Sequence, residues 1–129
     1  MILVDTSVWI RFLANQAPYA ARLDTLLDRG EVTGHELIYG ELLIGDRGGR
    51  AKLLAAYEKM HQAAVIPHSD VVMFARGRKL HGRGIGWIDV HLLASAIVDH
   101  LQLWTADERL AAVARKFGVN WESAGLKQV

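Results

Sequence analysis

Two acidic residues stand where short apolar runs of this chain end. Asp5 follows the run at residues 2–4, and Asp107 lies just beyond Thr105, which closes the run at residues 101–105. Such runs are typical of buried strands. In parallel α/β sheets, sites form at the carboxyl ends of strands, near the point where the strand order reverses. Asp5 and Asp107 therefore lie where a functional site is expected.

Two more acids occupy the apolar faces of predicted helices. Glu41 lies three and four residues after the apolar pair 37–38, so it shares their face. Asp89 lies three and four residues before the leucines at 92–93, with the same consequence. A carboxylate at a buried position costs free energy unless it is paired or bound to a metal. Glu41 and Asp89 therefore need a positively charged partner or a metal ion, whereas acids on the surface do not.

Convergence of the four acids would define a chemistry. Their mutual repulsion would raise their pKa values unless a cation neutralises them. The chain has no cysteine, and its six histidines show no paired metal-ligand spacing. Carboxylate oxygens without histidine or thiolate partners suit Mg²⁺ or Mn²⁺. Such an ion can activate water and hold a phosphate oxygen, which is the chemistry of phosphodiester hydrolysis.

Each acid also has a purely structural explanation. Asp5 and Asp107 can cap the helices that follow them, and Glu41 and Asp89 can each pair with a buried arginine. A phosphatase with an aspartyl nucleophile at Asp5 would want a second acid where Ser7 stands. A receiver-like signalling domain would want paired acids near the first strand. A metal-binding or RNA-binding module without turnover remains the non-enzymatic alternative.

The elements that must position the acids alternate along the chain. Strands are predicted at 2–4, 31–34, 63–66, 101–105 and 119–121, and helices at 8–14, 18–30, 37–43, 50–61, 69–80, 88–100 and 108–117. Short apolar strands alternating with helices predict parallel βαβ units and the α/β class. We expect Trp9 and Trp104 in the core, and Trp87 either in the core, on a base or at a protein contact.

Size and composition exclude several classes of protein. The 129 residues suit a single domain, with 51% hydrophobic and 22% charged residues as in soluble globular proteins. The lack of cysteine excludes a disulfide framework and fits a cytoplasmic location. No apolar run reaches the roughly 18 residues of a membrane span, and the N-terminus does not resemble a signal peptide. Because the net charge is only +1, any surface that binds nucleic acid must come from basic residues clustered in one place.

One such cluster precedes Asp89. Arg76, Arg78, Lys79 and Arg83 lie just before and within a glycine-rich loop that leads to the acid. Basic side chains there can hold an RNA backbone without reading its sequence. A solvated helix face is the alternative interpretation.

Four segments around the acids resemble, in order, the motifs of PIN-domain nucleases. They are Asp5-Thr6-Ser7-Val8-Trp9, Glu41-Leu42-Leu43-Ile44-Gly45, Asp89-Val90-His91-Leu92-Leu93-Ala94-Ser95-Ala96 and Leu103-Trp104-Thr105-Ala106-Asp107. Order, spacing and length resemble the VapC-type toxins of bacterial toxin–antitoxin modules over essentially the whole chain. Glu36 also lies in the second region, but the Leu-Leu and glycine that follow Glu41 match the family pattern. We interpret Glu36 as a first-turn acid favoured by the helix dipole, and Glu108 in the same way.

The resemblance implies a three-layer α/β/α sandwich with a central parallel sheet, formed by one PIN-like nuclease domain over residues 1–129. It implies a Mg²⁺- or Mn²⁺-dependent endoribonuclease, the toxin of a type II system, with an RNA substrate, a cognate antitoxin and a homodimeric state. By position, the resemblance makes Asp5, Glu41, Asp89 and Asp107 catalytic, with Asp5, Asp89 and Asp107 as metal ligands and Thr6, Ser7 and Thr105 as supporting polar residues.

Overall fold

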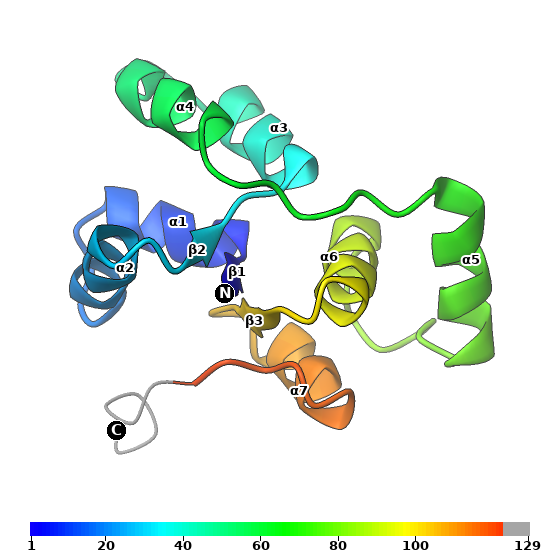
Figure 1. The fold of residues 1–129 in the computed structure, drawn as a ribbon. Helices are drawn as coiled ribbons and strands as arrows, with labels where there is room; N and C mark the ends of the chain where they lie inside the picture. The colour runs from blue at the N-terminus through cyan, green and yellow to red at the C-terminus, as the bar shows by residue number, and fades with distance from the viewer. Residues whose placement is uncertain (123–129) are drawn as a thin grey trace.

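A computed structural model describes residues 1–122 as a small parallel sheet surrounded by helices (Figure 1). The strands β1 (Ile2–Val4), β2 (Val32–Thr33) and β3 (Gln102–Trp104) lie in the order β2-β1-β3, all parallel. The helices are α1 (Thr6–Leu13), α2 (Tyr19–Asp28), α3 (Glu36–Ile44), α4 (Ala51–Glu58), α5 (His68–Gly77), α6 (Trp87–Val98) and α7 (Glu108–Lys116). The predicted α/β class and parallel sheet are confirmed.

The strand order places a reversal point between β1 and β3. The chain leaves β1 through α1 and α2 to pair β2 on one side of it. It then returns through four helices to pair β3 on the other side. The carboxyl ends of β1 and β3 are therefore neighbours, and Asp5 and Thr105 follow them directly. This is the location at which doubly wound sheets bind their ligands.

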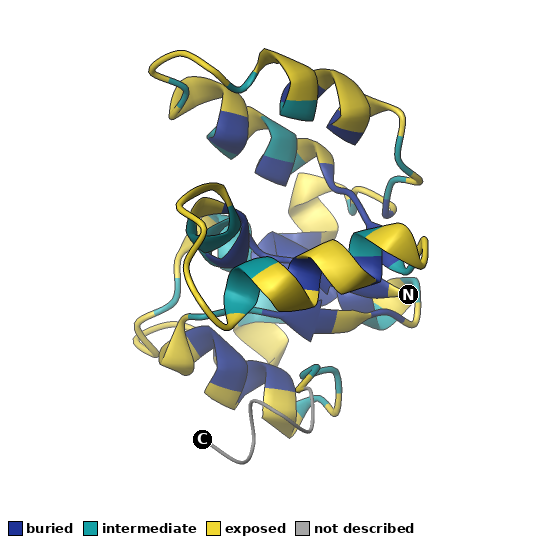
Figure 2. Ribbon diagram, turned by 90° about the vertical axis from the view of Figure 1, so that its left-hand side faces the viewer, coloured by how far each residue is buried: buried dark blue, intermediate teal, exposed yellow. Residues whose placement is uncertain are grey.

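Helices cover the sheet from both sides (Figure 1). α1 and α2 pack together on one side, while α6 lies on the other with α5 outside it. Buried residues gather on the strands and on the helix faces directed at them, and the outer helix faces are exposed (Figure 2). Trp9 and Trp104 are 1% and 2% exposed, which confirms their predicted core positions. The chain turns after α2 and α7 at Gly30 and Gly118, whose positive φ angles suit glycine.

The predicted strand at 63–66 is wrong. Only a single bridge, between Gly34 and Gln62, extends the sheet there. The backbone of Ala64 bonds instead to side chains near the end of α6: its N–H donates to Asp99 Oδ2, and its carbonyl accepts from Ser95 Oγ. A backbone whose hydrogen bonds go to side chains has none left for a strand partner.

Two smaller expectations also change. Residues 119–121 form one parallel bridge, between Leu103 and Asn120, in place of a strand. The helix predicted at 69–80 begins at His68, directly after Pro67, and ends at Gly77. Within residues 1–122 no helix has the length and apolar character needed to cross a membrane.

Candidate active site

Asp5 is the buried centre of the acidic cluster. It is 6% exposed and occupies the N-cap position of α1, yet its side chain makes no capping hydrogen bond. Its Oδ2 atom accepts hydrogen bonds from Ser7 Oγ at 2.6 Å and from Thr105 Oγ1 at 2.8 Å. No donor among residues 1–122 reaches Oδ1. The interpretation of Asp5 as a mere helix cap is therefore wrong.

The two hydroxyl groups tie the ends of β1 and β3 together. Ser7 Oγ accepts the N–H of Ala106 at 3.0 Å, and Thr105 Oγ1 accepts the N–H of Asp107 at 3.0 Å. A hydroxyl that accepts a backbone N–H can still donate its own hydrogen, and both donate to Asp5. The Asp5 carboxylate is thereby held in one orientation by groups that are themselves fixed to backbone.

Glu41 reaches the cluster from α3. Thr6 Oγ1 donates to Glu41 Oε1 at 2.6 Å, and Thr6 is the residue directly after Asp5. The start of α3 is fixed by His35, whose Nδ1 accepts from the N–H of Leu37. The carboxylate of Glu41 is partly buried at this contact.

Glu36 lies away from the cluster on the same helix. It is exposed in the first turn of α3, as its predicted role requires, and lines a separate cavity with Tyr39 and Glu58. Of the two carboxylates, Glu41 lies beside the end of β1 and Glu36 does not, which agrees with the choice of Glu41.

Asp89 has a raised pKa, as expected for a partly buried carboxyl group near other acids. It is the third residue of α6, and its Oδ2 accepts the N–H of Gly86 at 3.0 Å. Burial raises the pKa of Asp89; the Gly86 hydrogen bond opposes the rise, and the negative charges of Asp5, Asp107 and Glu41 add to it. Asp5, Asp107 and Glu41 thus each lie close enough to Asp89 to repel its charge.

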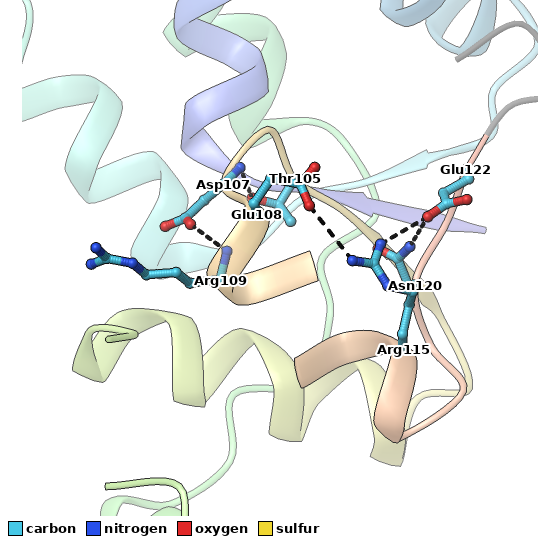
Figure 3. Close-up of polar contacts among 7 residues, drawn as sticks. All are labelled: Thr105, Asp107, Glu108, Arg109, Arg115, Asn120 and Glu122. Carbon is cyan, nitrogen blue, oxygen red and sulfur yellow. Dashed lines mark hydrogen bonds and ion pairs between the residues drawn. The ribbon is translucent and has the colours of Figure 1, made fainter. Parts of the chain in front are cut away.

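Asp107 has a second role as a helix cap. Its Oδ1 accepts the N–H of Arg109 at 2.9 Å at the start of α7, as Figure 3 shows. The capping interpretation is therefore correct for one oxygen atom. The side chain is exposed, and its other oxygen has no donor in the described part of the chain.

Among residues 1–122, no basic side chain forms an ion pair with any of the four acids. The ion pairs among residues 1–122 join Arg115 to Glu108 and to Glu122, outside the cluster. The alternative in which Glu41 and Asp89 pair with buried arginines is therefore wrong. The cluster is a concentration of negative charge with no cationic partner in the described part of the chain.

The donor set fits a hard divalent cation. As placed, no three acidic or histidine side chains of residues 1–122 are close enough to bind one ion together. Mg²⁺ commonly uses one or two protein carboxylates and keeps several waters, so it does not require three. Carboxylates that repel one another, with oxygen atoms that accept no hydrogen bond, match this mode of binding.

The glycine-rich loop, which carries one member of the basic cluster, lies near the acids, whereas Arg78 lies over the ring of Phe117 at the far end of α7. Arg83 Nε donates to the carbonyl of Lys79, and Gly84 packs so closely on Arg109 that a Cβ atom there would lie 2.8 Å from its Cδ. Because α7 begins beside Asp107, this contact places the loop next to the acidic cluster. The remaining members of the cluster are exposed at the end of α5, namely Arg76 and Arg78.

Sequence reasoning did not identify Arg109. A cation in the first turn of a helix opposes the helix dipole, and this unfavourable placement was the available signal. Trp87 is 42% exposed and packs edge-on against His68 and His91, which excludes the core position among its three expected roles and leaves the base and protein contacts as predictions.

Comparisons with known proteins give one consistent result. The family model described as PIN domain matches residues 2–116, a span that contains all four acids. Two relatives are named Ribonuclease VapC32, from Mycobacterium tuberculosis strains H37Rv and CDC 1551. Each is 41% identical over 120 residues, covering 92% of this chain and 94% of the relative.

Proposed function

Because the chain belongs to the PIN-domain family, we propose that it is a metal-dependent endoribonuclease, the toxin of a VapC-type toxin–antitoxin pair. The observation that carries this proposal is that Asp5, Glu41 and Asp107 lie near enough to Asp89 to raise its pKa, beside the adjacent ends of β1 and β3, and that none of the four has an ion pair among residues 1–122. The relatives named as ribonucleases supply the substrate class. The network of Ser7 and Thr105 supplies the rigidity that such a site needs.

We assign a Mg²⁺ or Mn²⁺ ion to the group formed by Asp5, Asp89 and Asp107, in which one or two carboxylates at a time would bind it directly and waters would complete its shell, because no three of these side chains lie close enough to bind one ion together as placed. When bound, the ion lowers the pKa of the water that it holds and neutralises charge on the scissile phosphate. Asp5 contributes Oδ1, because Oδ2 is committed to Ser7 and Thr105. Asp107 contributes the oxygen that does not cap α7.

Glu41 is the residue of the cluster that we assign to proton transfer. Thr6 occupies Oε1, which leaves Oε2 to accept a proton from the attacking water. The water oxygen then bonds to phosphorus as the bond from phosphorus to the leaving oxygen breaks, and the leaving oxygen takes a proton from solvent to become a hydroxyl group. The basic side chains around the glycine-rich loop position the RNA backbone.

The test is cleavage of total RNA by purified protein. EDTA should abolish cleavage, and added Mg²⁺ or Mn²⁺ should restore it. Asp5→Asn and Glu41→Gln should each lower the cleavage rate at least about 100-fold. Glu36→Gln is the matched control, because it makes the same chemical change on the exposed part of α3. Cleavage undiminished by EDTA, or equal activity of Glu41→Gln and Glu36→Gln, would refute the mechanism.

We also propose an antitoxin and a second copy of this chain as its protein partners. Supporting this, Leu43 and Ile44 at the end of α3 are 51% and 88% exposed, and Met73 on α5 is 72% exposed. Apolar side chains left in solvent favour protein contacts. Sedimentation of the purified protein tests the dimer. Co-purification with the product of an adjacent small gene, and loss of that complex in Ile44→Glu, tests the antitoxin.

A further inference from the structure

A cavity of about 580 Å³ adjoins the acidic cluster, a volume in the range of small-ligand sites. Three aromatic rings line it. Tyr19 is stacked on Trp104 with 6.1 Å between ring centroids, and Trp121 lies 4.7 Å from Trp104. Thr105 lines the same cavity and donates to Asp5 Oδ2. One residue therefore belongs to both the cavity and the acidic cluster.

We propose that this cavity binds a nucleobase of the RNA strand, beside the phosphodiester bond that is cut. This inference rests on the proposed nuclease function, and it adds a subsite that contributes to the choice of cleavage position. Aromatic rings are the common platform for bases of single-stranded nucleic acid. The shared Thr105 means that a strand with its phosphate at Asp5 can place a neighbouring base against Tyr19 and Trp121.

The charges of the rim favour a base over a phosphate. Arg115 bonds to Glu122 at 3.0 Å and lies 3.6 Å from Glu108, as Figure 3 shows. Both carboxylates engage one guanidinium, so the charge of Arg115 is already partnered at this rim. A phosphate entering there would have to compete with these carboxylates for Arg115, whereas an uncharged base would not.

The hydrogen-bonding groups of the rim favour guanine. Asn120 Nδ2 donates to Glu122 Oε1 at 2.8 Å, which leaves Asn120 Oδ1 as an acceptor at the cavity. Glu108 adds an exposed carboxylate nearby. An acceptor-lined rim pairs with N–H donors, and guanine offers two adjacent donors, N1–H and N2–H, on one edge.

The experiment is a fluorescence titration of the full chain with nucleoside monophosphates in EDTA, which prevents cleavage. GMP should quench tryptophan emission at lower concentration than AMP, CMP or UMP. Ribose 5-phosphate, which lacks a base, should cause no change. Trp121→Leu should weaken GMP binding roughly tenfold or more, since it removes one stacking ring. Trp87→Leu is the matched control, because Trp87 is an exposed tryptophan that does not line this cavity.

A second variant keeps the test independent of the folding of Trp121→Leu. Asn120→Ala removes the acceptor and should reduce the preference for GMP over AMP. Equal quenching by GMP and ribose 5-phosphate, or unchanged GMP binding in both variants, would overturn the inference. RNA cleavage with an unaltered sequence preference in both variants would also overturn it and leave the nuclease function standing. GMP binding without any RNA cleavage would instead refute the nuclease function and support the base-binding cavity.

Discussion

Thr105 donates a 2.8 Å hydrogen bond to Asp5 Oδ2, although 100 residues of sequence separate them. The same Thr105 oxygen accepts the N–H of Asp107 at 3.0 Å. One hydroxyl group thus connects the end of β1, the end of β3 and the start of α7. Two of the four acids depend on it for their positions.

Thr105→Val should lower RNA cleavage about 10- to 100-fold, as the loss of a group that orients a metal ligand commonly does. Valine keeps the shape of the side chain but cannot donate to Asp5. The Mg²⁺ concentration for half-maximal activity should rise, and Thr105→Ser should retain most activity. Equal rates in the valine and serine variants would mean that the hydroxyl is not needed.

Asp89→Asn should abolish cleavage yet leave the unfolding free energy of the metal-free protein unchanged or higher. The raised pKa of Asp89 means that its ionised form opposes folding at neutral pH, because it is buried beside other negative charges. The neutral amide removes that repulsion. Urea denaturation at pH 7 in EDTA measures the effect. Clear destabilisation would indicate that the carboxylate has a structural role.

Asp107→Asn and Asp107→Ala separate the two roles of this residue. Asparagine caps a helix as well as aspartate does, whereas alanine should cost about 1 kcal/mol of unfolding free energy. If the carboxylate also binds the metal, both variants should lose cleavage activity to a similar extent. Full activity in Asp107→Asn would assign the side chain to capping alone.

Arg78→Ala combined with Lys79→Ala should weaken RNA binding and flatten its salt dependence. Each lost phosphate contact removes about 0.7 from the slope of log K against log salt for a single strand. A filter-binding series in EDTA at several salt concentrations measures that slope. Lys52→Ala with Lys59→Ala, in and after α4, removes two exposed positive charges elsewhere. Identical slopes for the two double variants would identify Arg78 and Lys79 as part of a solvated helix face.

His35 should make the fold sensitive to mild acid. Burial, with a smaller contribution from His91, lowers its pKa from 6.5 to about 4. Below pH 6.5 the unfolded chain binds a proton that the folded chain does not, so the unfolding free energy falls as the pH drops toward 4. The loss should be on the order of 3 kcal/mol at pH 4.

Urea denaturation at intervals from pH 7 to pH 4.5 measures this slope. Asn is the test substitution, because it can still cap α3 toward Leu37 but does not titrate. His35→Asn should show a shallower decline than the unmodified protein above pH 5. Parallel declines in the two proteins would exclude His35 as the source.

The sequence alone determined the parallel α/β class, the core positions of Trp9 and Trp104, and the acids to consider. These follow from local patterns: short apolar runs between helices, and carboxylates at strand ends or on apolar helix faces. The expected convergence of the acids agrees with the charge interactions around Asp89. Their catalytic and metal-binding roles stay predictions.

The tertiary structure decided what depends on contacts between distant segments. It replaced the predicted strand at 63–66 with backbone bonds to Ser95 and Asp99. It gave Asp5 its two hydroxyl donors, and it formed the aromatic cavity from segments about 100 residues apart. A sequence pattern records which face of an element is apolar. It does not record which distant side chain meets that face, because packing selects the partner only once the whole chain has folded.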